Sequence, residues 1–229
     1  MVDVYWAQRK DAEAGIDRIL SDQERVRLNS IKCLDTALSF QMGRSMLRRT
    51  VAQRQGCHPE NVPVQLSGGA RGKPTLPGTG WEISLSHSGH WVGLAITKGA
   101  AIGMDIEGVD EGWDPLPIAP LVCTPHERQE LWGVAAGSRA RMFTRLWTRK
   151  EAVLKATGQG IRHDLNQLQV GPSCRTPVDA TWTPDDRSHP IVRLVDLQDR
   201  PEALASLAAL TAGAVKVTEH DGSALVRIN

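Results

Sequence analysis

The segment Ile102–Glu107 reads Ile-Gly-Met-Asp-Ile-Glu and holds two carboxylates two residues apart. The alternating apolar residues predict a strand whose successive side chains point to opposite faces. Asp105 and Glu107 would then share one face with Gly103, about 7 Å apart by the rise of two residues. Like charges held that close repel unless a cation lies between them, and Mg²⁺ commonly takes one or two carboxylates with phosphate and water. Gly103 would leave this face open to a bulky ligand, whereas two solvated acids at a strand edge are the alternative.

A second group of charged residues lies in Ser138–Ala156, for which we expect a helix. At about 100° per residue its buried stripe consists of Met142, Phe143, Leu146, Trp147, Val153 and Leu154. Lys150 falls within this stripe and Glu151 at its border, although charged residues are uncommon on the packed side of a helix unless paired or used. Glu151 and Lys155 are spaced i, i+4, so a surface ion pair worth about 0.3 to 0.5 kcal/mol is the alternative for these two. That alternative does not explain Lys150.

A helix start precedes this segment at Thr124-Pro125-His126-Glu127. Thr124 would be the N-cap, Pro125 the first helical residue and Glu127 the third, which is the capping-box pattern. Glu127 therefore has a structural explanation and ranks second as a metal-site candidate.

The composition is that of an ordinary globular protein, with 41% hydrophobic and 23% charged residues among 229. No run of residues approaches a membrane span, and the N-terminus lacks the basic start and apolar stretch of a signal peptide, so we expect a cytoplasmic protein. The four cysteines are too widely spaced for structural zinc or a disulfide framework, and we interpret them as reduced thiols: Cys33, Cys57, Cys123 and Cys174.

The formal net charge is only +1, but it is unevenly distributed. Residues 18–54 hold eight basic residues and three acidic ones, whereas residues 105–131 hold seven acidic residues and one arginine. This asymmetry favours a polyanionic partner at one region and a cation at the other. Nucleic acid is a competing partner for the basic stretch, but its basic residues are not interleaved with aromatics and the whole chain is nearly neutral.

Periodicity predicts several further elements. We expect strands at Val2–Ala7, Val62–Leu66, Trp81–His87, Trp91–Thr97, Ile191–Leu197 and Ala214–Thr218. Short helical pieces are expected in Asp11–Leu28, with Ser21 as a cap, and an amphipathic helix in Leu34–Val51, which Gly56 and Pro59 would end. The polar face of that helix would show Arg44 and Arg48, for which a solvated helix face is the alternative. Leu204–Thr211 is ambiguous, because its alanines favour helix by propensity.

Two shorter patterns could bind an anion or a metal ion. The turn-rich loop from Ser67 lacks the pattern of a Walker phosphate-binding loop, but Lys73, just before Pro74, could hold an anion. His87 and His90 have the spacing of a metal pair, but no other zinc or iron ligands are evident.

Four motifs in series connect these observations. They are Gly72-Lys73-Pro74, Ile83-Ser-Leu-Ser86-His87-Ser-Gly89, Ile102-Gly-Met-Asp105-Ile-Glu107 and Phe143-Thr-Arg-Leu-Trp147-Thr-Arg-Lys150-Glu151-Ala-Val-Leu-Lys155. In this order and spacing the chain resembles the 4′-phosphopantetheinyl transferases of the long, Sfp (surfactin-synthetase-activating) type. The motifs span Gly72 to Lys155, and the flanks resemble the family in length and rough pattern.

The resemblance implies an α+β fold, a pseudo-dimer of two similar α+β halves at residues 1–100 and 101–229. Coenzyme A would bind in the cleft between the halves. Family enzymes transfer the phosphopantetheine arm of coenzyme A to a serine of an acyl or peptidyl carrier protein and release 3′,5′-ADP. The internal duplication leads us to expect a monomer, and the resemblance implies that Leu204–Thr211 is a strand.

By motif position, the resemblance also implies roles for individual residues. Mg²⁺ on the pyrophosphate would be held by Asp105, Glu107 and Glu151. Residues expected to contact coenzyme A are Lys73, Pro74, Ser86, His87, Lys150 and Lys155. An arginine common in the family aligns with Ser39, so the 3′-phosphate charge would come from Arg27, Lys32 or Arg44.

We expect Asp105, Glu151 and Lys155 to be the catalytic residues. Mg²⁺ and Lys155 would neutralise the phosphate oxygens, and Glu151 is our choice of general base. The role of base competes with that of metal ligand, because a fully coordinated carboxylate is a poor base. Two alternatives to a transferase stay open: a degenerate member that binds coenzyme A or a carrier protein without transfer, and a nucleic-acid-binding protein that uses residues 25–54.

Overall fold

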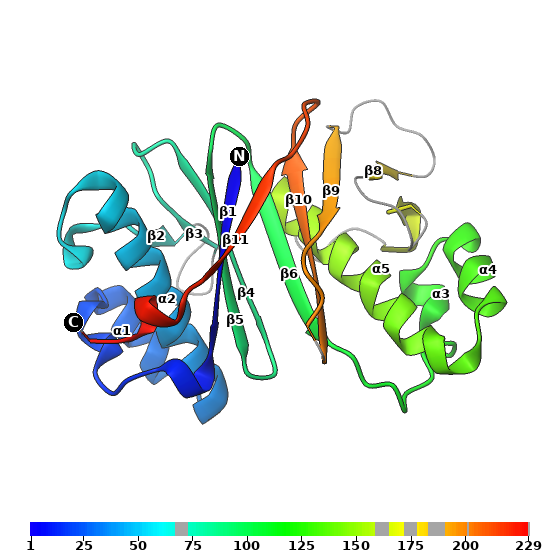
Figure 1. Ribbon diagram of the computed structural model, residues 1–229, viewed down its shortest axis with the longest axis horizontal. Helices are drawn as coiled ribbons and strands as arrows, with labels where there is room; N and C mark the ends of the chain where they lie inside the picture. The colour runs from blue at the N-terminus through cyan, green and yellow to red at the C-terminus, as the bar shows by residue number, and fades with distance from the viewer. Residues whose placement is uncertain (67–72, 159–164, 172–177, 183–190, 201, 229) are drawn as a thin grey trace. The chain divides into compact units, whose positions relative to one another are not determined.

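The computed structural model describes residues 1–66, 73–158, 165–171, 178–182, 191–200 and 202–228 (Figure 1). The chain forms two compact units, Met1–Gly99 with Val217–Asn229, and Ala100–Lys216. Each unit combines helices with a sheet around its own hydrophobic core, which confirms the α+β class. The expected division at residue 100 placed residues 217–229 in the second half, whereas in the structure they belong to the first unit. That these units are separate domains stays a prediction.

The first unit is built on a sheet of order β11-β1-β5-β4. Strands β1 (Val2–Gln8), β4 (Trp81–Ser88) and β5 (Trp91–Lys98) lie close to their predicted positions. β4 and β5 form a hairpin, turning at Gly89 with a left-handed φ of 55°. The C-terminal strand β11 (Val217–Asp221) pairs parallel to β1, three residues further along the chain than we expected.

Helix α2 (Leu34–Gln55) packs on this sheet, as Figure 1 shows, and ends at Gly56 with a φ of 66°. Its packed face holds Met42, Met46, Leu47 and Val51, as the periodicity predicted. Helix α1 (Asp22–Asn29) begins with the predicted cap at Ser21, completed by Glu24 as a capping box. The unit also contains short strands and 3₁₀ turns: β2 (Gln65–Leu66), β3 (Pro74–Thr75), η1 (Arg9–Asp11), η2 (Ile16–Ile19), η3 (Pro59–Asn61) and η6 (Ser223–Val226).

The second unit is built on a sheet of order β6-β10-β9-β8-β7. The strands are β6 (Ile102–Gly108), β7 (Leu168–Gln169), β8 (Val178–Trp182), β9 (Val192–Asp196) and β10 (Ala203–Leu210). The helices are α3 (Ala119–Val122), α4 (Pro125–Gly133) and α5 (Ala136–Thr157), with the turn η5 (Leu165–Gln167) after α5. Helix α5 packs on β6 and β10 and matches the predicted helix.

Strand β10 shows where helix propensity fails. Its sequence Ala-Leu-Ala-Ser-Leu-Ala-Ala-Leu favours helix, yet it pairs antiparallel with both β6 and β9. Seven of its eight residues are buried, because both edges and the α5 side are covered. Small side chains suit this position, since α5 must approach the sheet closely. The strand expected from the resemblance is thereby confirmed.

The two units repeat one arrangement. In each, a short capped helix carries a buried glutamate at its third position, and a 22-residue helix that follows carries its cationic partner. Glu24 of α1 pairs with Arg48 of α2 at 2.7 Å, and Glu127 of α4 pairs with Lys150 of α5 at 2.7 Å. This correspondence agrees with the expected similarity of the two halves. No helix in the described residues is both long enough and apolar enough to span a membrane.

Candidate functional site

Gly103 sets the distance between β6 and α5. A Cβ at this position would lie 2.0 Å from the carbonyl oxygen of Ala152, 2.4 Å from the amide nitrogen of Ala156 and 2.8 Å from the Cβ of Lys155. Our expectation that Gly103 leaves its face open for a ligand is therefore wrong. The backbone of α5 fills that space, and this close approach brings the residues on either side of Ala152 to the carboxylate of β6.

Asp105, Glu151 and Lys155 meet where α5 crosses β6. The Lys155 ammonium lies 2.6 Å from Oδ1 of Asp105 and donates to the Met104 carbonyl at 3.2 Å. Asp105 is buried and Glu151 is half-buried. Burial raises the pKa of Glu151, the nearby Asp105 carboxylate raises it further, and Lys155 partly offsets both effects. The structure thus gathers all three predicted catalytic residues.

The carboxylates of this cluster fit a hard divalent cation. Oxygen donors are the ligands that Mg²⁺ prefers, and the effect of Asp105 on the pKa of Glu151 shows that the two carboxylates repel each other. Glu107 lies two residues beyond Asp105 on the same strand and is half-buried. Within the described ranges, no three acidic, histidine or cysteine side chains already form a metal-ready group. The place of Glu107 among metal ligands stays a prediction.

Lys150 is a structural residue in this fold. Its ammonium is fully buried, pairs with Glu127 at 2.7 Å and donates to the carbonyls of Leu165 and Leu168 at 2.8 and 2.6 Å. Burial lowers the pKa of Lys150, and Glu127 works against that shift. The expected contact of Lys150 with coenzyme A is corrected accordingly, because all three donors of its ammonium are occupied inside the core. Glu127 is likewise structural, since it also caps α4.

Most other residues expected to contact coenzyme A line one cavity of the first unit. The cavity measures about 320 Å³, and its walls include Arg27, Ser39, Arg44, Pro74, Ser86 and His87. These side chains come from α1, α2, β3 and β4, so residues up to 60 positions apart in the sequence line the same cavity. Lys73 and Lys32 are described but do not line the cavity. Gly72 and Arg71 of the preceding loop lie outside the described residues.

Arg44 and Arg48 do not lie on a solvated helix face. Arg48 is 1% exposed, donates to Glu24 through Nε and Nη2, and donates to three carbonyls after α2 through Nη1. Arg44 is 5% exposed, with its guanidinium 4.9 Å above the ring of Phe40. Sequence reasoning missed Glu24, which joins these two arginines. Its capping-box position predicts only a helix start, because its partners lie 20 and 24 residues away.

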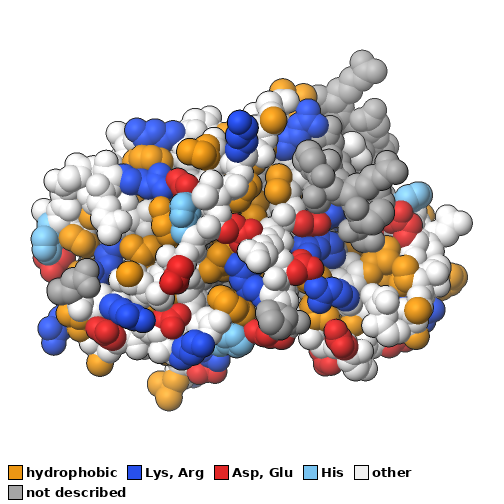
Figure 2. All heavy atoms as spheres, viewed as in Figure 1, with side chains coloured by type: hydrophobic (Ala, Val, Ile, Leu, Met, Phe, Trp, Pro, Cys, Tyr) orange, Lys and Arg blue, Asp and Glu red, His pale blue; other side chains and the backbone are white. Residues whose placement is uncertain are grey.

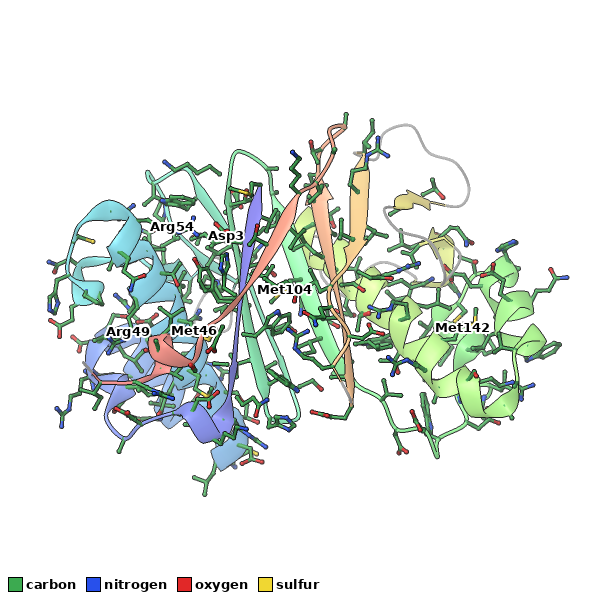
Figure 3. The ribbon with its side chains drawn as sticks, in the orientation of Figure 1. Asp3, Met46, Arg49, Arg54, Met104 and Met142 are labelled. Atoms are coloured by element: carbon green, nitrogen blue, oxygen red, sulfur yellow. The ribbon has the colours of Figure 1, made fainter. Side chains whose placement is uncertain are left out.

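Six of the eight basic residues within 18–54 make intramolecular side-chain contacts. Arg54 pairs with Asp3 at 2.6 Å, and both residues are labelled in Figure 3. Arg25 donates to the carbonyl of Arg18. On the face shown in Figure 2, basic and acidic side chains are interspersed. These contacts do not favour a continuous basic surface for nucleic acid.

Comparison with known proteins matches residues 101–207 to the 4′-phosphopantetheinyl transferase superfamily. A putative 4′-phosphopantetheinyl transferase of Synechocystis is 31% identical over 67% of this chain and 63% of its own length. The 4′-phosphopantetheinyl transferase HetI of Nostoc is 31% identical over 66% of this chain and 64% of its own. Over residues 101–207 the chain is thus similar to the 4′-phosphopantetheinyl transferase superfamily. The 4′-phosphopantetheinyl transferase psf-1 of Bacillus pumilus, 29% identical over 69% of this chain and 68% of its own, is consistent with the Sfp type within that superfamily.

The superfamily match runs from the start of β6 into β10 and therefore includes Asp105, Glu107, Glu151 and Lys155. The chain spans less than two thirds of the length of the first two relatives. None of these similarities supports a nucleic-acid-binding protein. The cavity of the first unit lies outside the matched region.

Proposed function

We propose that this protein transfers the 4′-phosphopantetheine arm of coenzyme A to a serine of an acyl or peptidyl carrier protein and releases 3′,5′-ADP. The observation that carries this proposal is the superfamily match over residues 101–207, which contains the strand and helix that bring Asp105, Glu151 and Lys155 together. The relatives named as 4′-phosphopantetheinyl transferases support it.

The reaction exchanges one phosphorus–oxygen bond for another. The serine hydroxyl attacks the phosphorus that carries the pantetheine arm, and the pyrophosphate bond breaks with its electrons going to 3′,5′-ADP. Such a step needs neutralised charge on the phosphate oxygens, an in-line nucleophile and a group that takes the hydroxyl proton. The cluster on β6 and α5 has side chains suited to the first and third of these needs.

Glu151 is the proposed general base. Burial and the neighbouring Asp105 raise its pKa, which makes it a stronger proton acceptor than an exposed glutamate. Lys155 supplies a fixed positive charge for the pyrophosphate oxygens. Asp105 and Glu107 would hold Mg²⁺, with Glu151 as a further ligand if the base acts through water. When bound, Mg²⁺ would neutralise pyrophosphate charge by Lewis acidity.

We further propose that the nucleotide end of coenzyme A occupies the cavity of the first unit. Phe40, Leu85 and Val92 give the cavity apolar walls, while Arg27, Arg44 and His87 supply positive or protonatable groups. This mixture suits a purine ring and ribose that carry phosphate. The expected role of Lys73 at coenzyme A stays part of this proposal. So does a monomer working in the cytoplasm, which a molar-mass measurement and cell fractionation would test.

The proposal is tested by incubating the protein with coenzyme A, Mg²⁺ and a panel of apo carrier proteins from fatty-acid, polyketide and nonribosomal-peptide systems. Each carrier's intact mass is then measured. We expect at least one carrier to gain the mass of one phosphopantetheine arm, and EDTA or Asp105→Ala to prevent the gain. No gain on any carrier, with the protein folded and coenzyme A bound, would favour the degenerate member instead.

A further inference from the structure

Lys155 is the cation of the carboxylate cluster on β6 and α5. Its ammonium lies 2.6 Å from Oδ1 of the buried Asp105 and donates to the Met104 carbonyl at 3.2 Å. Burial and the Asp105 carboxylate raise the pKa of Glu151, whereas the charge of Lys155 lowers it. One ammonium therefore acts on both carboxylates, and it does so with the sign of charge that a divalent cation at this cluster would have.

The Lys155 ammonium can leave Asp105 without opening the core. Its side chain is 31% exposed, whereas that of Lys150 on the same helix is fully buried. Lysine has a flexible stem and a compact charge, so the ammonium can exchange one anion for another while the stem stays in place. The stem of Lys155 starts against Gly103, where a Cβ would lie 2.8 Å from the Lys155 Cβ. The ammonium therefore stays within reach of Asp105.

We propose that Lys155 is an internal competitor of Mg²⁺ for Asp105, and that phosphate oxygens relieve this competition by taking the ammonium. The inference rests on the proposed function, because it takes Asp105 as a ligand of Mg²⁺ and the pyrophosphate of coenzyme A as the anion. A divalent cation on the carboxylate that Lys155 contacts is repelled by the ammonium. Metal and pyrophosphate then bind cooperatively, since by linkage each raises the affinity of the protein for the other.

Binding of Mg²⁺ alone tests the competition without coenzyme A or a carrier. Calorimetry would titrate Mg²⁺ into wild type, Lys155→Met and Lys155→Arg at one ionic strength. We expect Lys155→Met to bind Mg²⁺ about tenfold more tightly than wild type, a Coulomb effect reduced by solvent at a partly exposed pair. Lys155→Arg keeps the charge and should stay close to wild type. An affinity in Lys155→Met that equals or falls below that of wild type would overturn the proposal.

Arg141 supplies the matched control. It also lies on α5, its side chain is 39% exposed, and it pairs with Asp199 at 2.7 Å. Arg141→Met therefore removes one positive charge from a similar ion pair of the same helix, about 21 Å from Lys155 along the helix axis and beyond the Debye length. Its Mg²⁺ affinity should remain that of wild type. A gain as large as that of Lys155→Met would show that Mg²⁺ responds only to net charge, and the proposal would fail.

Melting curves repeat the test for a variant of low stability. Lys155→Met leaves Asp105 buried without its cation, so it should melt below wild type in EDTA. Mg²⁺ should then raise the melting temperature of Lys155→Met more than that of wild type, because tighter binding to the folded state stabilises it more. Equal increases in the two proteins would contradict the competition.

Electron paramagnetic resonance of Mn²⁺ tests the release by phosphate. Mn²⁺ accepts the same oxygen ligands as Mg²⁺, and its free form is measured directly, with the Mn²⁺ held by coenzyme A alone subtracted. Saturating coenzyme A should increase the Mn²⁺ affinity of wild type about tenfold more than that of Lys155→Met, because only wild type has an ammonium to displace. Equal increases would overturn the coupling between metal and pyrophosphate.

These measurements separate the inference from the proposed function. If wild type modifies no carrier but Lys155→Met binds Mg²⁺ more tightly, the transferase proposal fails and the competition stands. If wild type modifies carriers and the Mg²⁺ affinities of wild type and Lys155→Met are equal, the competition alone fails.

Discussion

Lys150 and Lys155 lie five positions apart on α5 and have opposite surroundings. Lys150 is sealed in the core with Glu127, whereas Lys155 is 31% exposed and pairs with Asp105 beside the half-buried Glu151. Family position alone placed both lysines at the ligand. The position of Lys150 within the hydrophobic stripe did indicate a buried ion pair as one possibility, because a charged residue on the packed face of a helix either has a buried partner or binds a ligand. Its partner, 23 residues earlier in the chain, was recognised only as a helix cap.

Replacing Lys150 tests its structural role. Lys150→Met leaves the Glu127 carboxylate buried without its cation, and we expect a loss of about 3 to 5 kcal/mol in the free energy of unfolding. The folded fraction should bind coenzyme A as wild type does. Denaturant unfolding and calorimetry with coenzyme A measure both quantities. A tenfold weaker affinity with unchanged stability would restore Lys150 to the ligand site.

Glu151→Gln tests the base. Since burial and Asp105 both disfavour the charged form of Glu151, the neutral amide should fold at least as stably as wild type. We expect kcat to fall about 10²- to 10⁴-fold, the range for loss of a positioned proton acceptor. Steady-state kinetics together with a melting curve provide the measurement. Normal turnover in this variant would refute the assignment.

At the scale of elements, the contact between β6 and α5 determines whether the catalytic cluster forms. Periodicity predicted both elements, and the cap at Ser21 and the capping box at Thr124 predicted the starts of α1 and α4, because these signals are local. The sequence did not reveal that Gly103 is there for the helix backbone rather than for a ligand. That role depends on a contact with Ala152, 49 residues later.

Gly103, at this contact, and Gly137, away from it, should respond in opposite ways to the same change. Gly103→Ala places a Cβ 2.0 Å from the Ala152 oxygen, and we expect a loss of about 3 kcal/mol or more because backbone must move. Gly137→Ala, in the first turn of α5, meets no atom within 4 Å and should gain about 0.4 to 1 kcal/mol. Denaturant unfolding of both variants measures the difference. Equal effects would contradict the packing described here.

At the scale of the whole molecule, the chain ends meet within the first unit. Asp3 of β1 accepts from Arg54 at 2.6 Å and lies 3.0 Å from Nε2 of His220 on β11, whose ring stacks on Tyr5. The sequence predicted both strands but not their pairing, because parallel partners 215 residues apart leave no local signal. Part of the charge in the basic stretch is paired within the unit, as Glu24 is with Arg48.

Asp3 makes the stability of the β1–β11 pairing depend on pH. Burial favours a higher pKa for Asp3, but hydrogen bonds from His220 and Arg54 outweigh it and the pKa is lowered. A lowered pKa means that ionised Asp3 stabilises the fold at pH values above its pKa in the unfolded chain, which is about 3.9. This stabilisation is lost as the pH falls through the lower pKa of Asp3 in the folded protein.

We expect the melting temperature to fall less between about pH 5 and pH 3 in Asp3→Asn than in wild type. Asp17→Asn is the control, because within the described residues its carboxylate has no ion pair or hydrogen bond. Identical acid profiles for wild type and Asp3→Asn would contradict the closure described here.

The most direct test of the central proposal follows the phosphorus atoms. Phosphorus NMR of coenzyme A with Mg²⁺, a responsive apo carrier and catalytic protein should show the pyrophosphate signals disappear. A phosphodiester signal on the carrier and the 5′-monophosphate signal of 3′,5′-ADP should appear in equal amounts, while the 3′-monophosphate signal already present in coenzyme A persists. Pyrophosphate signals that persist, with folded protein and every carrier of the panel tried, would contradict a transferase.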